Sequence, residues 1–226
     1  MIRYKIILFL FFMLLCFSIQ ALHSVNLRAE EPNLSLSDII TRVEHRYAAS
    51  SFSADFFQAS TIKAMEITDT ASGKAFFKHP GMMRWEYEKP DKQIIITDSN
   101  TIWIYRPGDN QVMIGESPSF FGDGKGASFL ADMKLIRKKF SITLEKSDRK
   151  GHRVLKLVPR EKKFDLAVIY LSISAATFNV DEITIYNSYE DETKIELSNI
   201  QFKKNLKDSM FSFQIPQGVE VMQLEE

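Results

Sequence analysis

Hydrophobic positions recur at helical spacing just before residue 50. Apolar side chains three or four residues apart lie on one face of a helix, and here they are Leu36, Ile39, Ile40, Val43 and Tyr47. Ser35 and Asp38 begin this run as a pair that resembles a capping box, in which side chains bond the free backbone groups of the first turn. The pattern predicts one amphipathic helix over 35–48.

From Phe52 onward the pattern changes to short runs of β-branched and aromatic residues, which are typical of strands. Turn sequences separate them, among them Pro80-Gly81, Lys89-Pro90, Ser99-Asn100 and Pro107–Asn110. Because such short connections cannot make a parallel crossover, the strands are predicted to be antiparallel. The predicted strands are 53–68, 73–79, 82–88, 92–98, 101–106, 111–116, 140–147, 152–159, 167–174, 180–188, 192–203 and 210–215.

A glycine-containing stretch and a second helical pattern interrupt the strands. Glycines at 122, 124 and 126 precede a predicted helix over 128–138. Its narrow apolar face is formed by Phe129, Leu130, Met133 and Ile136. Two helices and about a dozen strands predict an α+β, mainly β fold, in which so large a sheet curls.

Alternation along the central strands separates an apolar face from a polar one, because successive side chains point to opposite faces of a sheet. Met83, Trp85 and Tyr87 share one face. Arg84 and Glu86 share the other, where Arg84 is expected to meet solvent or an acid. In later strands the same rule groups Ile94 with Ile96, and Trp103 with Tyr105.

A curled sheet with such a bulky apolar face encloses either a packed core or a pocket. Two helices are few to cover a dozen strands, and seven of the nine methionines lie beyond residue 29. Methionine is unbranched and adapts to ligands of variable shape, although it also fills gaps in ordinary cores. These features favour a pocket over a packed core.

The first residues have the pattern of a secretory signal peptide. Arg3 and Lys5 precede the apolar run 6–19, whose fourteen residues fall short of the ~20 that span a bilayer. We expect a cleaved signal peptide over 1–29 and a single domain over 30–226. Cleavage after Ala21 and an uncleaved anchor helix are the alternatives.

Cleavage would also remove the single cysteine. Cys16 follows Leu15, whereas a lipid-modified cysteine needs a small residue before it, so the protein itself is not expected to be lipidated. A chain without Cys16 has no disulfide, no catalytic thiol and no thiolate metal site.

Charge and motif content argue against other functional classes. Beyond residue 29 the chain keeps 26 basic and 29 acidic residues, so it is mildly acidic and is not expected to bind nucleic acid. Histidines 45, 79 and 152 lack metal-ligand spacing, and residues 115–119 lack the second glycine of a nucleophile elbow. We expect that the protein is not an enzyme and that it binds no metal and no cofactor.

Three segments of the chain match a known family in order and spacing. They are Ser53–Gln58, Phe77–Val112, which includes Trp85, Asp98 and Trp103, and Phe211–Val219. On these segments the chain resembles the outer-membrane lipoprotein carriers of the LolA family, from one end of the predicted domain to the other.

The resemblance implies an unclosed antiparallel β-barrel of about eleven strands, with helices as a lid over an apolar cavity. The residues expected to form the wall of an acyl cavity are Phe56, Met83, Trp85, Tyr87, Trp103 and Tyr105. The residues expected in the lid are Ile40, Val43, Phe129, Leu130 and Met133. For Trp103 in particular, plain core packing is the alternative.

The resemblance also implies a function. A periplasmic carrier would bind the acyl chains of lipoproteins, receive them from an ABC-type release transporter in the inner membrane, and pass them to an acceptor at the outer membrane. We expect such a carrier to be a monomer. Two alternatives stay open: a carrier or acceptor of another lipid or glycolipid, and a half-barrel sensor module that binds a protein partner.

One position departs from the family pattern. Many LolA proteins place an arginine before the proline that matches Pro80, and this arginine hydrogen-bonds the lid; here the residue is His79. A histidine can still bond a lid carbonyl, but with fewer donors than a guanidinium. His79 is therefore the candidate gate.

Overall fold

The computed structural model describes residues 34–48, 51–117, 129–161, 165–203 and 205–224. The predicted signal peptide lies outside these residues. The chain divides into two compact units, Met1–Leu34 and Ser35–Glu226, and the elements described below belong to the second.

Helix α2 (Leu36–Ala48) begins at the predicted cap. The Ser35 hydroxyl donates to the Asp38 carboxylate at 2.6 Å, and the Asp38 backbone N–H donates to the Ser35 hydroxyl at 3.2 Å. The bond from the hydroxyl lowers the pKa of the Asp38 carboxyl below its usual value. The predicted apolar stripe is confirmed, because α2 buries Ile39, Ile40, Val43 and Tyr47.

Twelve strands form one sheet in the described part of the chain, in the spatial order β12-β6-β5-β4-β3-β2-β1-β11-β10-β9-β8-β7. The first six are β1 (Ser51–Ile62), β2 (Ile67–Lys78), β3 (Met82–Lys89), β4 (Gln93–Asp98), β5 (Thr101–Arg106) and β6 (Gln111–Glu116). The others are β7 (Phe140–Glu145), β8 (His152–Pro159), β9 (Val168–Ser174), β10 (Val180–Tyr186), β11 (Glu192–Lys203) and β12 (Glu220–Gln223). A short 3-10 helix, η2 (Pro107–Asp109), lies between β5 and β6.

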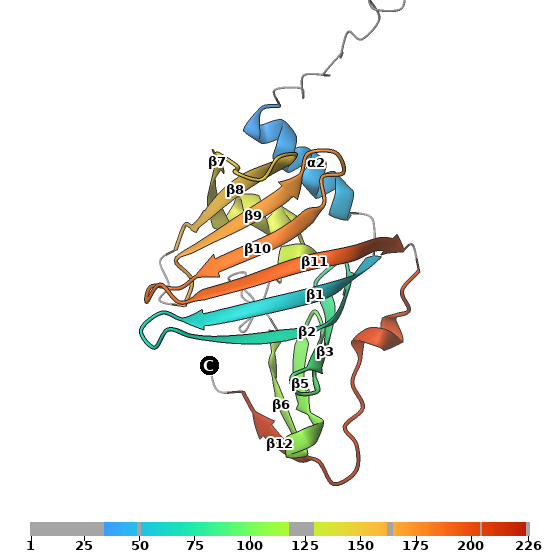
Figure 1. The fold of residues 1–226 in the computed structure, drawn as a ribbon. Helices are drawn as coiled ribbons and strands as arrows, with labels where there is room; N and C mark the ends of the chain where they lie inside the picture. The colour runs from blue at the N-terminus through green and yellow to red at the C-terminus, as the bar shows by residue number, and fades with distance from the viewer. Residues whose placement is uncertain (1–33, 49–50, 118–128, 162–164, 204, 225–226) are drawn as a thin grey trace, which may run out of the picture. The chain divides into compact units, whose positions relative to one another are not determined.

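The sheet consists of two meanders, β1–β6 and β7–β11, joined where β1 pairs with β11. Phe52 lies opposite Phe202 in this pair, and Figure 1 shows the two strands side by side in the middle of the sheet. Strands β7 and β12 are its two edges and do not pair with each other. This confirms the predicted fold class, mainly β with a sheet that does not close into a barrel.

The strand predicted over 53–68 is wrong at its end. A turn after Ile62 breaks it into β1 and β2, with the Met65 N–H donating to the Ile62 carbonyl at 3.2 Å. Glu66 closes the turn with a φ of +55°. No glycine or proline marks this turn, so the sequence pattern predicted one continuous strand across it.

The last predicted strand, 210–215, is also wrong. Its first residues belong to a 3-10 helix, η4 (Asp208–Phe211), and the final strand is β12. β12 runs parallel to β6, with Val221 opposite Val112, whereas the other strand pairs are antiparallel as predicted. The long connection after β11 makes a parallel pairing possible.

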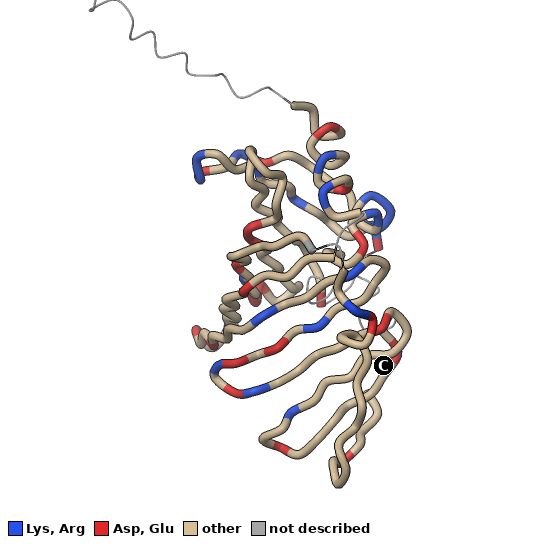
Figure 2. Tube along the Cα trace, turned by 90° about the vertical axis from the view of Figure 1, so that its right-hand side faces the viewer, with Lys and Arg blue, Asp and Glu red and all other residues tan. Residues whose placement is uncertain are grey.

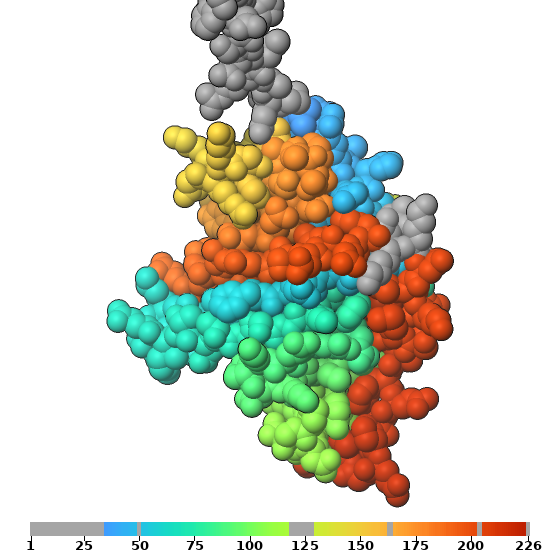
Figure 3. Space-filling model, turned by 45° about the vertical axis from the view of Figure 1, so that its right-hand side comes forward, coloured from blue at the N-terminus to red at the C-terminus, as the bar shows by residue number. Residues whose placement is uncertain are grey.

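The C-terminal segment, residues 205–219, covers one face of β3–β6, and Figure 3 shows it lying along these strands. The Arg84 guanidinium donates to the Met210 carbonyl at 3.2 Å, and the Lys78 ammonium donates to the Leu206 carbonyl at 2.8 Å. Phe211 is fully buried. The segment therefore packs as part of the fold.

Replacing Phe211 by alanine should lower the free energy of unfolding by about 3–5 kcal/mol, because it empties a buried aromatic site. Urea denaturation measures this loss. The control is Ile215→Ala in the same segment, where the side chain is 42% exposed and the loss should stay below about 1 kcal/mol. Equal, small losses in both variants would contradict the burial of Phe211 between the segment and the sheet.

Candidate functional site

The strand register assigns side chains to the two faces of the sheet, because residues opposite each other on neighbouring strands point to the same side. Ala75, Trp85 and Ile95 follow one another across β2, β3 and β4. Phe77 and Met83 belong to the same side. We call this side the inner face and the opposite side the outer face.

Aromatic rings gather on the inner face where β1, β2 and β3 meet. The Phe52 and Phe77 rings stack at 4.5 Å between centroids, and the Phe77 and Trp85 rings meet edge to face at 5.4 Å. Phe56 contacts both Trp85 and Tyr87 at 4.9 Å. These five residues form one cluster, called the aromatic cluster below.

Small residues on β2 make this crowding possible. Gly73 lies between Phe56 on β1 and Tyr87 on β3, and the two rings meet over it. A Cβ atom at Gly73 would lie 1.9 Å from the Glu86 carbonyl oxygen, so any other residue would force the backbone to move. Ala75, which is fully buried, leaves similar space beside Trp85.

The cluster carries a single phenol, and its hydroxyl has a partner. The Tyr87 hydroxyl donates to the Gln58 side-chain carbonyl at 3.1 Å. Burial raises the pKa of Tyr87 to about 12. The phenol therefore stays neutral at physiological pH, and the inner face keeps no charge at this point.

The apolar inner face continues across the second meander. Ile195 on β11 lies opposite Ile183 on β10, which lies opposite Leu171 on β9, which in turn lies opposite Leu155 on β8. All four are buried. Phe56 lies opposite Leu197 at the junction of the two meanders, so one apolar surface spans both.

Helix α2 lies over the inner face. The Tyr47 ring meets the rings of Phe52 and Phe202 at 5.1 and 5.5 Å. The Tyr47 hydroxyl accepts the Val180 backbone N–H at 2.9 Å, and burial raises the pKa of this phenol. The predicted lid residues Ile40 and Val43 are 5% and 2% exposed.

The second covering element differs in detail from the predicted helix over 128–138. Residues 129–131 form a 3-10 turn, and helix α4 (Lys134–Lys139) follows, visible behind the strands of the second meander in Figure 1. The predicted lid residues Phe129, Leu130 and Met133 are 1–3% exposed. We call α2 and residues 129–139 together the cover.

A few polar contacts hold the cover together. The Arg137 guanidinium on α4 donates to the Glu44 carboxylate at 2.7 Å and to the Thr41 hydroxyl at 2.9 Å, both on α2. The aromatic cluster beneath is closed, since the side chains of Phe52, Phe56, Phe77 and Trp85 are 1–4% exposed. The cover packs against the cluster through the rings of Tyr47 and Phe52.

His79, the candidate gate, contacts the cover. Its Nδ1 atom lies 3.2 Å from the Ala131 carbonyl oxygen, which also accepts the Gly81 backbone N–H at 3.2 Å. The Asp132 carboxylate lies 4.0 Å from the same nitrogen. The bond requires the proton on Nδ1, and it joins the turn after β2 to the 129–131 turn.

The register separates two predicted wall residues from the rest. Trp103 lies opposite Ile96, and Ile96 lies opposite Arg84, so Trp103 and Tyr105 are on the outer face. The Tyr105 ring meets the Phe213 ring at 5.2 Å, under the C-terminal segment. The structure therefore brings Phe56, Met83, Trp85 and Tyr87 together and places Trp103 and Tyr105 elsewhere.

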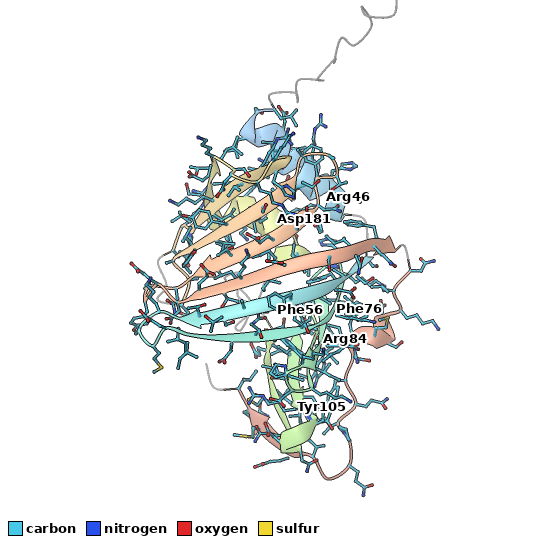
Figure 4. The ribbon with its side chains drawn as sticks, in the orientation of Figure 1. Arg46, Phe56, Phe76, Arg84, Tyr105 and Asp181 are labelled. Carbon is cyan, nitrogen blue, oxygen red and sulfur yellow. The ribbon has the colours of Figure 1, made fainter. Side chains whose placement is uncertain are left out.

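The length of the turn between β4 and β5 already indicated that Trp103 lies on the outer face. Ser99 and Asn100 form a two-residue turn, and pairing outward from it places Ile96 opposite Trp103. Arg84 is on the outer face as predicted, and its acidic partner is Glu86, with 2.5 Å between Nε and Oε1. Figure 4 shows Arg84 beside the C-terminal segment.

The described residues contain no group of three or more His, Cys, Asp and Glu side chains that could hold a metal ion. None of their helices has the length and apolar character needed to cross a bilayer.

The order of the elements and the covered apolar face agree with a family match. A family model described as outer membrane lipoprotein carrier protein LolA matches residues 48–214. The chain belongs to the LolA family. The resemblance noted in three segments is thus confirmed over most of the chain.

Named relatives point the same way. An outer-membrane lipoprotein carrier protein of Nitrosomonas europaea is 29% identical over 77% of this chain and 83% of its own. One of Neisseria meningitidis serogroup B is 25% identical over 77% of this chain and 81% of its own. The solved structure of an uncharacterized conserved protein from Thermus thermophilus shares the fold, with a TM-score of 0.55, 16% identity, and coverage of 84% and 100%.

Membership of the LolA family bears on whether this protein is an enzyme. Proteins of this family are lipoprotein carriers, which bind a cargo and catalyse no reaction, so the expectation that this protein is not an enzyme is confirmed.

In this LolA-family protein, His79→Ala should loosen the cover. Loss of the bond to the Ala131 carbonyl should speed hydrogen exchange of the α4 amides by about fivefold, the equivalent of one hydrogen bond. His79→Arg should keep the protection, since a guanidinium offers more donors. The control is His45→Ala, at an exposed position of α2; unchanged exchange in His79→Ala would argue against a gate.

Proposed function

We propose that this LolA-family protein is a periplasmic carrier that holds the acyl chains of lipoproteins against its inner face. The observation that carries the proposal is a continuous apolar face of β1–β4 and β8–β11, closed by a cover with few polar contacts. The proposed acyl-binding residues are Phe56, Met83, Trp85 and Tyr87, and the proposed gate is His79.

Burial of methylene groups supplies the driving force. At about 0.8 kcal/mol per methylene, one sixteen-carbon chain contributes on the order of 12 kcal/mol before costs. Opening the cover breaks the contacts of His79 and Gly81 with Ala131 and exposes the aromatic cluster. This cost offsets part of the gain and keeps binding reversible.

Reversible binding is what a carrier requires. If opening the cover costs free energy, an acceptor with a more open apolar site can draw the cargo away, because a ligand moves toward the state that binds it better. We assign loading to an ABC-type release transporter of the inner membrane and delivery to an acceptor at the outer membrane. The carrier works as a monomer, after removal of the signal peptide over 1–29.

One observation favours a second candidate. The aromatic cluster is closed and its rings contact one another, as in a packed core. A half-barrel module that binds a protein partner would have such an interior and would take up no lipid.

The two tryptophans of the chain allow a direct test, because Trp85 is on the inner face and Trp103 on the outer face. A brominated fatty acid quenches a tryptophan that it touches. It should quench Trp85 in the Trp103→Phe variant and should leave Trp103 bright in the Trp85→Phe variant. Both changes keep an aromatic ring, and thermal unfolding checks that each variant is folded.

Equal quenching in the two variants would mean binding without an acyl site on the inner face. No quenching in either would favour the protein-binding module. Mass spectrometry of lipids bound to the natively purified protein then separates lipoprotein acyl chains from a glycolipid, which is the remaining alternative cargo.

A further inference from the structure

Basic residues are concentrated at one end of the sheet. Residues 134–161 hold ten of the 29 Lys and Arg residues of the chain but only three of its 29 Asp and Glu residues. The chain as a whole has no net charge, so the rest of it is acidic by the same amount. Figure 2 shows Lys and Arg positions at the end that carries α4, β7 and β8.

Six of these residues flank the edge strand β7 at both ends. Lys138, Lys139 and Arg160 lie at its start, where the Arg160 N–H bonds the Lys139 carbonyl at 2.9 Å. Lys146, Arg149 and Lys150 lie in the turn that follows it. Within the described residues none of the six side chains forms an ion pair. We call these six residues the basic edge.

The two groups of basic residues are far enough apart to contact a flat, extended surface at the same time. At ~3.3 Å per residue, the six residues of β7 separate the groups by roughly 20 Å. Leu144, on the inner face of β7, is 45% exposed, and Val158, on the outer face of β8, is 41% exposed, so each side of this edge carries an exposed apolar side chain. Exposed apolar side chains among cations are typical of proteins that lie on membrane interfaces.

A small pocket opens at the start of β7. It has a volume of about 110 Å³, and Lys138, Lys139 and Arg160 line it together with Glu161, Pro159 and the buried side chains of Phe140 and Leu166. Three cations around an apolar floor match the chemistry of a phosphate on a lipid, where charge and hydrocarbon adjoin.

We propose that the basic edge docks this protein reversibly on bilayers that contain anionic phospholipids. The acidic remainder of the chain is repelled by the same surface, so the protein would dock with β7 toward the bilayer. An acidic protein partner would also attract six cations, but it gives no reason for the exposed Leu144 and Val158. The proposal does not depend on an acyl site on the inner face.

Vesicle flotation tests the proposal with the purified protein after removal of the proposed signal peptide, because the apolar run 6–19 would itself bind vesicles. The protein should float with vesicles of equal parts phosphatidylglycerol and phosphatidylcholine and stay behind with pure phosphatidylcholine, and raised salt should release it. Replacing Lys138, Lys139 and Arg160 by glutamine should weaken partitioning by at least about tenfold. The triple variant of Lys146, Arg149 and Lys150 should behave in the same way.

The matched control carries the same loss of charge elsewhere. Lys63, Lys89 and Lys92 are exposed and lie in or next to the connections between strands of the first meander, and their glutamine variant should float like the unmodified protein. Equal losses in control and basic-edge variants would overturn the proposal, since net charge alone would explain them. The proposal would also be overturned if the protein did not float, or if it floated equally well with neutral vesicles. Binding to polyglutamate without binding to anionic vesicles would overturn it as well. Thermal unfolding confirms that each variant is folded.

Discussion

The pairing of β1 with β11 is the interaction on which the rest of the structure depends. It brings Phe52 opposite Phe202, across most of the length of the domain, and joins two meanders that would otherwise be separate sheets. Only through this pairing do Phe56 and Leu197 become neighbours on one apolar face. Closing so long a loop is costly in chain entropy, and the backbone ladder and the buried rings offset that cost.

The two faces of the first meander are covered in different ways. The inner face carries the aromatic cluster, which fits because Gly73 and Ala75 leave space between larger neighbours. The outer face of β3–β6 is covered by the C-terminal segment, in which Phe211 is buried and Phe213 meets the ring of Tyr105. In the proposed carrier, a single sheet would separate a fixed core from a face whose cover moves, so that binding would change one side without disturbing the other.

Few polar contacts hold the cover in place, and the basic residues are concentrated at one edge of the sheet. The cover is held by the bonds at Ala131 and Arg137 and by packing, while the inner face below it carries no charge at Tyr87. Lysines and arginines gather instead at the β7 edge, away from the aromatic cluster. Apolar cargo and anionic surfaces would therefore meet different parts of the molecule.

The sequence by itself determined the local features. These are the capped helix α2 with its apolar stripe, most strands, and the turns marked by proline and glycine. The sequence also determined that Arg84 and Trp85 point to opposite faces of the sheet, and it indicated the family. These depend on residues close together in the chain. Only the tertiary structure decided that Trp103 faces away from Trp85, that β12 runs parallel to β6, and that the Ala131 carbonyl meets His79. Alternation orders side chains within one strand, but the face shared by two strands depends on register and on pairings between distant segments, which local sequence does not contain.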